Sequence, residues 1–235
     1  MSRLTLNLLG PFRVDLDGEE IRDFTTEKAR ALLAYVAVEA NRVHRRDFLA
    51  GLLWPDQPQQ KARRNLRQAL SHLRQAIRDE ESAFLLISRE TVQLNPESDC
   101  WLDVAAFADL MALSQKHRHR SVETCRPCIK RLETAVALYR GEFLRQFSVG
   151  DSAAFEEWAL LKREWLHRLA VDALFYLADY YERRGEYNVA RRYAWRQVEL
   201  EPWREEAHRQ LMQVLALSGQ RSAAIAQYQR CQHSL

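Results

Sequence analysis

The sequence predicts a mainly α protein with a small α+β part at its N-terminus, and three observations support this. Only seven of the 235 residues are Gly and six are Pro, while Leu, Ala, Arg and Glu are abundant, a balance that favours helix. Apolar and polar residues alternate over residues 4–16, which indicates strands. Apolar residues recur at helical spacing over most of the remaining chain, which indicates amphipathic helices.

The chain opens with a predicted antiparallel sheet. Residues 4–8 and 12–16 each present apolar side chains at every second position, and Gly10-Pro11 between them is a turn signal. Asp17-Gly18 follows directly and is a strong signal for a two-residue hairpin.

Three helices and a hairpin are expected next. The predicted elements are helices at about 26–39, 45–53 and 61–78 and hairpin strands at 84–87 and 91–94. Thr26 can cap the first helix with its hydroxyl. A sheet followed by three helices and a hairpin is typical of a winged helix-turn-helix with an additional N-terminal sheet. We predict this fold for residues 1–95.

The third of these helices carries the functional argument. Its apolar positions fall on one stripe: Ala62, Leu66, Ala69, Leu70, Leu73 and Ile77. The opposite side is polar, and no acidic residue occurs from Lys61 to Arg78. Arg can pair with guanine and Gln with adenine in the major groove. We therefore expect Arg64, Gln68 and Ser71 to contact base edges.

Basic residues around this helix extend the predicted DNA surface. Residues 42–78 contain nine Lys and Arg against two acidic residues, in a chain whose formal net charge is only +3. Such an island is typical of a nucleic-acid surface, although a solvated helix face is the alternative. Arg46, Arg63, Arg67 and Arg74 are expected to neutralise phosphates. The full predicted set is Arg45, Arg46, Lys61, Arg63, Arg64, Arg67, Gln68, Ser71, Arg74 and Arg89.

Residues 96–235 predict an all-α domain with tetratricopeptide-like repeats. The clearest sign is a self-similarity at a spacing of 34 residues. It aligns Leu177, Gly185, Ala190 and Ala194 with Leu211, Gly219, Ala224 and Tyr228. Such helix pairs bury their apolar faces only by stacking on neighbours. The second copy ends before its expected proline, so we expect the chain to be part of a longer protein with further domains.

A candidate metal site lies in the second domain. His117, His119, Cys125 and Cys128 offer two nitrogen and two sulfur ligands, the composition of a tetrahedral zinc site. The alternative is an ordinary helix connection with two half-buried thiols. Redox chemistry is less favoured, because the βαβ context of a thioredoxin-type motif is missing. No cofactor is otherwise expected.

Several segments resemble the SARP-type bacterial transcriptional activators, which join an OmpR-type winged helix to a bacterial transcriptional activator domain. The similar segments are 26–34, 52–56, 62–74, Trp101–Asp103, 137–144 and Glu157-Trp158. The resemblance implies double-stranded DNA as a partner, dimeric or tandem binding to direct repeats near promoters, and contact with RNA polymerase. The segment from His117 to Cys128 departs from the family pattern.

Other functional classes are less well supported. The seven glycines are never closer than eight positions apart, which excludes phosphate-binding glycine loops, and no nucleophile–base pair is identifiable, so we do not expect an enzyme. A protein-interaction adaptor that uses the helical repeats is the alternative function. No apolar stretch is long enough to span a membrane. With four cysteines and no visible signal peptide, we expect a cytoplasmic location, and the resemblance implies a bacterial cell.

Overall fold

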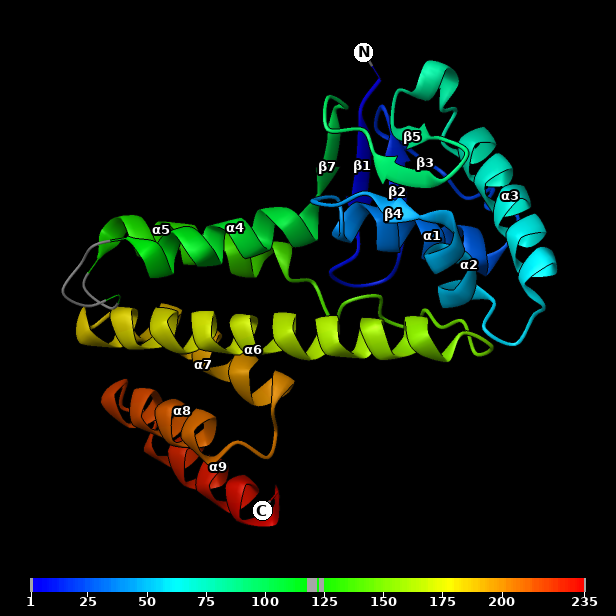
Figure 1. Ribbon diagram of the computed structural model, residues 1–235. Coiled ribbons are helices and arrows are strands. Elements are labelled where there is room, and N and C mark those ends of the chain that lie inside the picture. Colours follow the sequence, from blue (N-terminus) through cyan, green and yellow to red (C-terminus); the bar gives the residue numbers. More distant parts are fainter. Residues whose placement is uncertain (1, 118–121, 123–124, 235) are drawn as a thin grey trace. The chain divides into compact units, whose positions relative to one another are not determined.

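The computed structural model describes residues 2–117, 122 and 125–234 (Figure 1). The chain forms two compact units: an N-terminal unit of residues 1–106 and 140–165, and a C-terminal unit of residues 107–139 and 166–235. Helices α4 (Asp103–Lys116) and α6 (Ala153–Arg183) each contribute residues to both units. The units therefore differ from a division at residue 95, which stays a prediction. No helix among the described residues is long and apolar enough to cross a membrane.

A four-stranded sheet begins the N-terminal unit. Its strands are β1 (Leu4–Asn7), β2 (Arg13–Leu16), β3 (Glu19–Glu20) and β7 (Cys100–Leu102), in the order β3-β2-β1-β7. The predicted hairpin turn is confirmed, because Asp17 and Gly18 both adopt positive φ, 52° and 87°, as a two-residue hairpin turn requires. Strand β7 pairs parallel with β1, although it lies in the part of the chain for which the sequence predicted helices alone.

Three helices follow the first three strands. They are α1 (Glu27–Val38), α2 (Arg46–Leu53) and α3 (Gln59–Ala76). The Thr26 hydroxyl accepts a hydrogen bond from the backbone N–H of Ala29 at 3.2 Å, which confirms the predicted cap. All six apolar residues of the α3 stripe are buried. The sequence therefore predicted correctly which side of α3 faces the core.

A second sheet forms the predicted hairpin and one additional strand. Strands β5 (Leu85–Ile87) and β6 (Thr91–Leu94) pair antiparallel, and β6 also pairs with β4 (His44–Arg45). A 3-10 turn at Glu80–Ser82 connects α3 to β5. The two-residue strand β4 was not predicted, because it precedes α2 directly and shows no alternation of its own. It fixes the start of α2 to the hairpin.

Asp103 holds the end of β1 inside the N-terminal unit. Its fully buried carboxylate accepts hydrogen bonds from the backbone N–H groups of Leu8 and Leu9, each at 2.9 Å. Arg140 Nη2 donates to the same carboxylate at 2.8 Å. These donors replace the water that burial removes from the charged group. Asp103 and Arg140 are therefore structural residues of this unit.

Residues 140–165 supply part of the apolar core of the N-terminal unit. Phe143 and Phe155 are almost completely buried, and the Ser152 hydroxyl donates to the carbonyl of Leu53 at 2.7 Å. The Trp158 ring lies 4.8 Å from the Tyr35 ring of α1. The segment thus packs on the helices that position α3, although it lies far away in the sequence.

In the described part of the C-terminal unit, the regular elements are helices. In addition to parts of α4 and α6, it contains α5 (Arg126–Leu138), α7 (Tyr187–Leu200), α8 (Glu205–Leu217) and α9 (Arg221–Ser234). Gly185 and Gly219 adopt positive φ, 72° and 78°, at equivalent turns, where glycine avoids strain. Leu177 and Leu211 are both fully buried. The predicted 34-residue repeat is confirmed at these positions.

Candidate nucleic-acid interface

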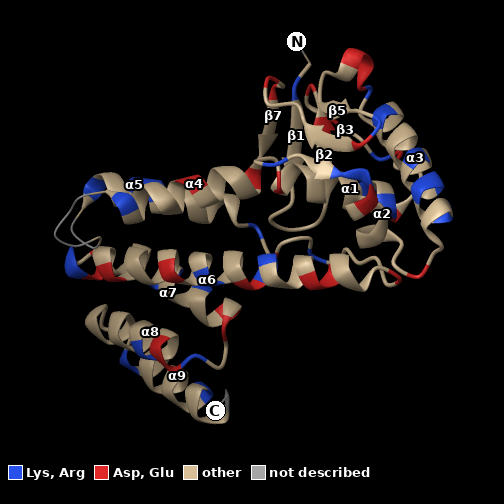
Figure 2. Ribbon diagram, viewed as in Figure 1, with Lys and Arg blue, Asp and Glu red and all other residues tan. Residues whose placement is uncertain are grey.

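Helix α3 presents one polar face without acidic residues. Arg64, Gln68 and Ser71 lie on its exposed side, opposite the buried stripe. Within the described parts of the chain, these three side chains form no hydrogen bond or ion pair with another residue. Figure 2 shows Lys and Arg distributed along α3. The sequence-predicted base-reading residues therefore share one exposed face, with their polar groups available to a ligand.

Arg63 is engaged in an ion pair. Its guanidinium donates two hydrogen bonds to the Asp47 carboxylate of α2, Nε at 2.6 Å and Nη2 at 2.7 Å. This hydrogen bonding lowers the pKa of Asp47 from its ordinary value. Both side chains are about half exposed, so the pair contributes little to stability. The positive charge of Arg63 is already balanced by Asp47, which weakens the prediction that Arg63 contacts a phosphate.

Arg74 binds the turn that ends α3. Its Nη2 donates to the carbonyl of Asp79 at 3.0 Å, and its Nε lies 3.5 Å from the buried carboxylate of the same residue. That carboxylate accepts a hydrogen bond from the backbone N–H of Phe84 at 2.7 Å. Arg74 therefore stabilises the connection from α3 to the hairpin, and its phosphate contact stays a prediction.

Arg46 connects α2 to the hairpin. Its Nη1 donates to the carbonyl of Ser88 at 3.0 Å, and its backbone N–H donates to the carbonyl of Glu90 at 2.8 Å. Arg89 lies between these two acceptors and is exposed at the hairpin tip. The contact with α2 thus places Arg89 next to the basic helices.

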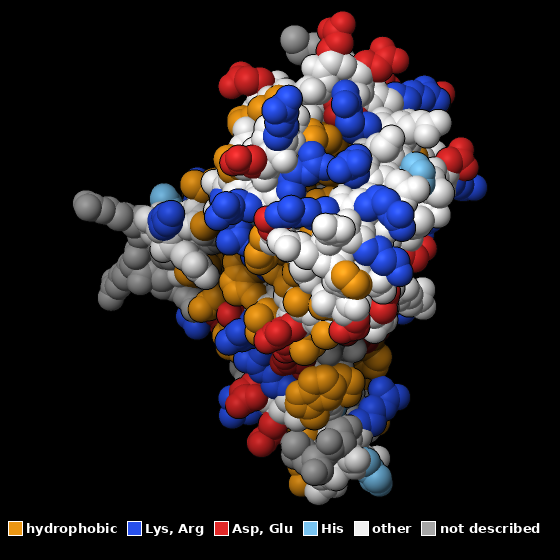
Figure 3. All heavy atoms as spheres, turned by 45° about the vertical axis from the view of Figure 1, so that its right-hand side comes forward, with side chains coloured by type: hydrophobic (Ala, Val, Ile, Leu, Met, Phe, Trp, Pro, Cys, Tyr) orange, Lys and Arg blue, Asp and Glu red, His pale blue; other side chains and the backbone are white. Residues whose placement is uncertain are grey.

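Two surface pockets, called hollows below, lie between α3 and the hairpin, and arginines line both. One, of about 500 Å³, is lined by Arg45, Arg46, Asp47, Arg63, Leu66, Arg67, Arg89 and Glu90. The other, of about 530 Å³, lies farther along α3 and includes Arg67, Ser71, Arg74 and Arg78. Figure 3 shows Lys and Arg side chains gathered on this face of the N-terminal unit. A hollowed basic surface beside an exposed helix suits a polyanion.

The structure brings most of the predicted DNA residues together on this surface. Arg45, Lys61, Arg67 and Arg89 are all exposed. Arg78 also lines the second hollow, although it was not among the predicted contacts. Its presence in the basic island was the signal that could have found it.

His44 makes the stability of this unit depend on pH. Its ring is buried against Tyr35, Nε2 donates to the Glu39 carbonyl at 3.1 Å, and burial lowers its pKa from the ordinary value, assisted by the charge of Arg42. The unfolded chain therefore binds a proton at higher pH than the folded chain does. We expect the free energy of unfolding to fall as pH decreases below about 6.5, by at most about 1.4 kcal/mol per pH unit for this group.

Denaturant unfolding followed between pH 7.5 and 5 measures this dependence. The His44→Gln variant should show a flatter pH dependence than the natural chain. His233→Gln, which changes an exposed histidine of α9, serves as the control and should leave the dependence unchanged. Identical slopes for the His44→Gln variant and the natural chain would contradict the assignment.

Three of the four predicted metal ligands converge. The ligand atoms of His117, Cys125 and Cys128 all lie within 4.8 Å of one another. His119, the fourth predicted ligand, lies outside the described residues. The convergence occurs between the end of α4 and the start of α5, both in the C-terminal unit.

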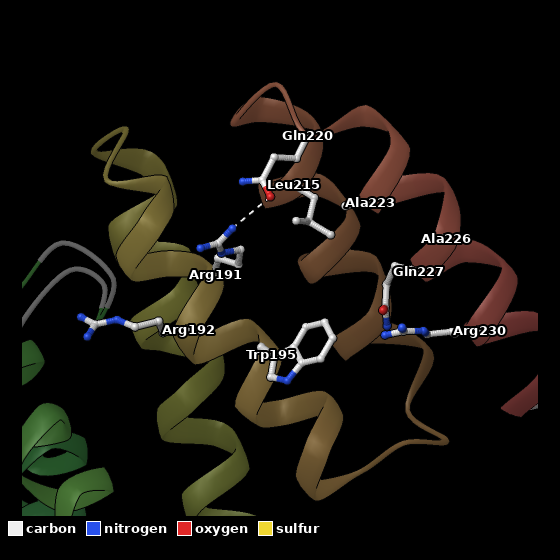
Figure 4. A pocket seen from close by; sticks show the side chains of 9 residues that line it. All are labelled: Arg191, Arg192, Trp195, Leu215, Gln220, Ala223, Ala226, Gln227 and Arg230. Carbon is white, nitrogen blue, oxygen red and sulfur yellow. Dashed lines mark hydrogen bonds between the residues drawn. The ribbon is translucent and has the colours of Figure 1, made fainter.

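A further hollow, of about 500 Å³, lies among α7, α8 and α9 (Figure 4). Trp195 of α7 and Leu215 of α8 form its apolar part, and the Arg230 guanidinium lies 5.8 Å from the centre of the Trp195 ring. At its edge, Arg191 Nη1 donates to Gln220 Oε1 at 2.9 Å. Trp195 is 40% exposed, so an apolar surface with positive charge around it is open to a ligand here.

The C-terminal part of the chain matches a known protein family. Residues 102–235 match the family model of the bacterial transcriptional activator domain. The chain belongs to this family. The match covers the helices from α4 onward and confirms the resemblance to SARP-type regulators. The family consists of transcriptional regulators and is not an enzyme class.

Two curated relatives are similar over nearly the whole chain. Both are transcriptional regulatory protein MoaR1, one from Mycobacterium tuberculosis (strain ATCC 25618 / H37Rv) and one from Mycobacterium bovis (strain BCG / Pasteur 1173P2). Each is 27% identical over 237 residues, covering 97% of this chain and 72% of the relative. The similarity therefore includes the N-terminal unit, which the family model does not cover completely.

A solved structure shares the fold. It is Mycobacterium tuberculosis EmbR in complex with a low-affinity phosphopeptide, which matches with a TM-score of 0.72 and 23% sequence identity over 100% of this chain. This match confirms the predicted winged helix with an N-terminal sheet followed by a helical domain. This chain spans 60% of the length of that protein.

Proposed function

We propose that this chain regulates transcription by binding specific sequences in double-stranded DNA through α3. In this proposal two copies bind direct repeats near promoters, and the helical unit contributes to contact with RNA polymerase, as the family membership suggests. Sequence-specific binding is the central element, since the other two depend on it.

The acid-free exposed face of α3 is the observation that carries this proposal. An α-helix fits the major groove when one side is free of core contacts and its polar groups are unpaired. Arg64, Gln68 and Ser71 meet this condition. We assign them to base edges, with Arg64 suited to guanine and Gln68 to adenine.

The phosphate contacts are assigned to basic residues that the fold leaves exposed. Arg63 and Arg74 are bound to Asp47 and Asp79. We therefore assign phosphates to four exposed basic residues that form no ion pair within the described part of the chain: Arg45, Lys61, Arg67 and Arg89. Such contacts fix the register of α3 on the duplex but carry no sequence information.

Selection from random duplexes tests the proposal. The full chain, bound to a pool of random DNA at near-physiological salt, should enrich one short sequence, recovered as direct repeats if two copies bind together. A sequenced pool without any enriched motif would contradict sequence-specific recognition. Enrichment of single sites only would contradict paired binding, but it would still agree with recognition of bases by α3.

The salt dependence of binding measures how many DNA phosphates the protein neutralises. Four neutralised phosphates per protomer predict a slope of log K against log salt near −3.6, because each contributes about −0.9. The Arg67→Ala variant should reduce the magnitude of this slope by about 0.9. Fluorescence anisotropy at several salt concentrations measures it.

A matched control removes a neutral pair from the same surface. The double variant Asp47→Ala/Arg63→Ala deletes one positive and one negative charge that already balance each other. Its slope should equal that of the natural chain. An equal reduction in this control and in Arg67→Ala would contradict the assignment of phosphates.

One observation favours a second function, that of a protein-interaction adaptor. The hollow beside Trp195 offers an exposed apolar surface with Arg191 and Arg230 at its rim, which suits an acidic peptide with an apolar anchor. The two functions are compatible, because the hollow lies in the C-terminal unit and α3 in the N-terminal unit.

A further inference from the structure

We propose that His117, Cys125 and Cys128 bind a zinc ion that joins α4 to α5. The three side chains come from two sides of the connection between these helices. His117 directly follows α4, whereas Cys125 and Cys128 lie at the start of α5. The proposal rests on this cluster alone and is independent of DNA binding.

The distances in the cluster are close to those in a zinc site. His117 Nδ1 lies 3.2 Å from Cys128 Sγ and 3.3 Å from Cys125 Sγ. Tetrahedral zinc, with bonds of about 2.3 Å to sulfur and about 2.0 Å to nitrogen, places such nitrogen and sulfur atoms about 3.5 Å apart. A shift of a few tenths of an ångström therefore accommodates the ion.

The start of α5 brings both cysteines to one place. Cys125 is the N-cap residue of α5, and Cys128 lies in its first turn. A separation of three residues also places both sulfur atoms on one side of the turn. The ligand spacing thus follows from the start of the helix.

Outer contacts orient the buried ligand. Cys128 is fully buried, and its sulfur lies 3.7 Å from the carbonyl oxygen of Ser114 on α4. Arg131, one turn further along α5, places Nη1 3.9 Å from the same sulfur. A nearby cationic N–H group offsets the negative charge that a coordinated thiolate retains.

The chemistry of the donor set favours zinc and a structural role. Two thiolates and one imidazole are typical zinc ligands, while Ca²⁺ and Mg²⁺ prefer oxygen. The three described ligands leave the fourth tetrahedral position to a water molecule or another donor. Bound zinc would link α4 to α5, and it would protect both thiols from oxidation.

Metal analysis of the full chain tests this proposal. Chain purified under reducing conditions with zinc present and then dialysed should retain about one zinc per molecule by mass spectrometry of the elements. Replacement by Co²⁺ should give the visible absorption of tetrahedral cobalt together with a thiolate-to-cobalt band in the near ultraviolet. Less than a tenth of an equivalent of zinc, or a spectrum typical of six-coordinate cobalt, would overturn the proposal.

Three variants locate the site. Cys128→Ser and His117→Asn should each lose the retained zinc and the tetrahedral cobalt spectrum. Cys100→Ser, which removes a partly buried thiol of β7, is the matched control and should keep both. Retention of the spectrum in His117→Asn and Cys128→Ser would show that the metal binds elsewhere.

A second readout covers the case in which Cys128→Ser does not fold. A chelator should lower the thermal midpoint of the natural chain and of Cys100→Ser but leave that of His117→Asn unchanged. An equal effect of the chelator on all three proteins, or on none, would overturn the proposal.

Discussion

A chain that ends at Asn95, the end of the predicted DNA-binding domain, is expected not to fold cooperatively. It lacks β7, the parallel neighbour of β1, and Asp103, the acceptor of the Leu8 and Leu9 N–H groups. It also lacks Phe143 and Phe155. Loss of one buried aromatic side chain costs about 3–5 kcal/mol, and a typical domain is stable by only about 5–15 kcal/mol. Circular dichroism on heating should show a broad, weak transition.

A point variant of the full chain measures one part of this effect. Phe155→Ala should lower the free energy of unfolding by about 3–5 kcal/mol, because the side chain is almost completely buried. Leu161→Ala on the same helix removes a side chain that is 65% exposed and should change it by less than about 0.5 kcal/mol. A sharp unfolding transition of the chain ending at Asn95, with unchanged DNA binding, would show that residues 140–165 are dispensable.

The largest effect on function is expected from α3. Arg64→Ala should weaken binding to the selected sequence by about 1–3 kcal/mol and relax the preference at one base pair. The double variant with Gln68→Ala should abolish the preference at two positions, because both polar groups that read bases are then absent. Binding to a scrambled duplex should change much less, since the phosphate contacts remain.

Competition between the selected and the scrambled duplex, followed by fluorescence anisotropy, gives the ratio of affinities. Arg209→Ala, which removes an exposed arginine of α8, is the control for a change of charge and should keep the ratio. Equal losses on both duplexes for Arg64→Ala would mean that Arg64 contacts phosphate and that α3 does not read sequence through it.

Local patterns in the sequence predicted much of the fold. The α3 stripe and the Thr26 cap depend on residues within a few positions of one another, so periodicity and capping rules apply to them directly. Strand β7 depends on a partner 96 residues away in the sequence, and a strand of three residues is too short to show alternation. Its pairing with β1 could not be predicted from the sequence.

The candidate site was predicted in its composition but not in its internal pairing. The charge pattern indicated which helix face is basic, and the structure places Arg64 and Gln68 on that face. The charge pattern could not show that Asp47 of α2 pairs with Arg63 or that Arg74 binds Asp79 in the turn after α3. These contacts depend on how the helices cross and where the chain turns. The same holds for His117 and the two cysteines, whose convergence requires both helices to be in place.

Recognition of guanine by Arg64 is the most direct test of the central proposal. Each guanine of the selected duplex is replaced in turn by 7-deazaguanine, which lacks the N7 acceptor in the major groove, and affinities are measured for the natural chain and for Arg64→Ala. At one position the natural chain should lose affinity, within the range of about 1–3 kcal/mol for a bidentate pair, while Arg64→Ala loses nothing more. Equal losses for both proteins at every position would contradict reading of the major groove by Arg64.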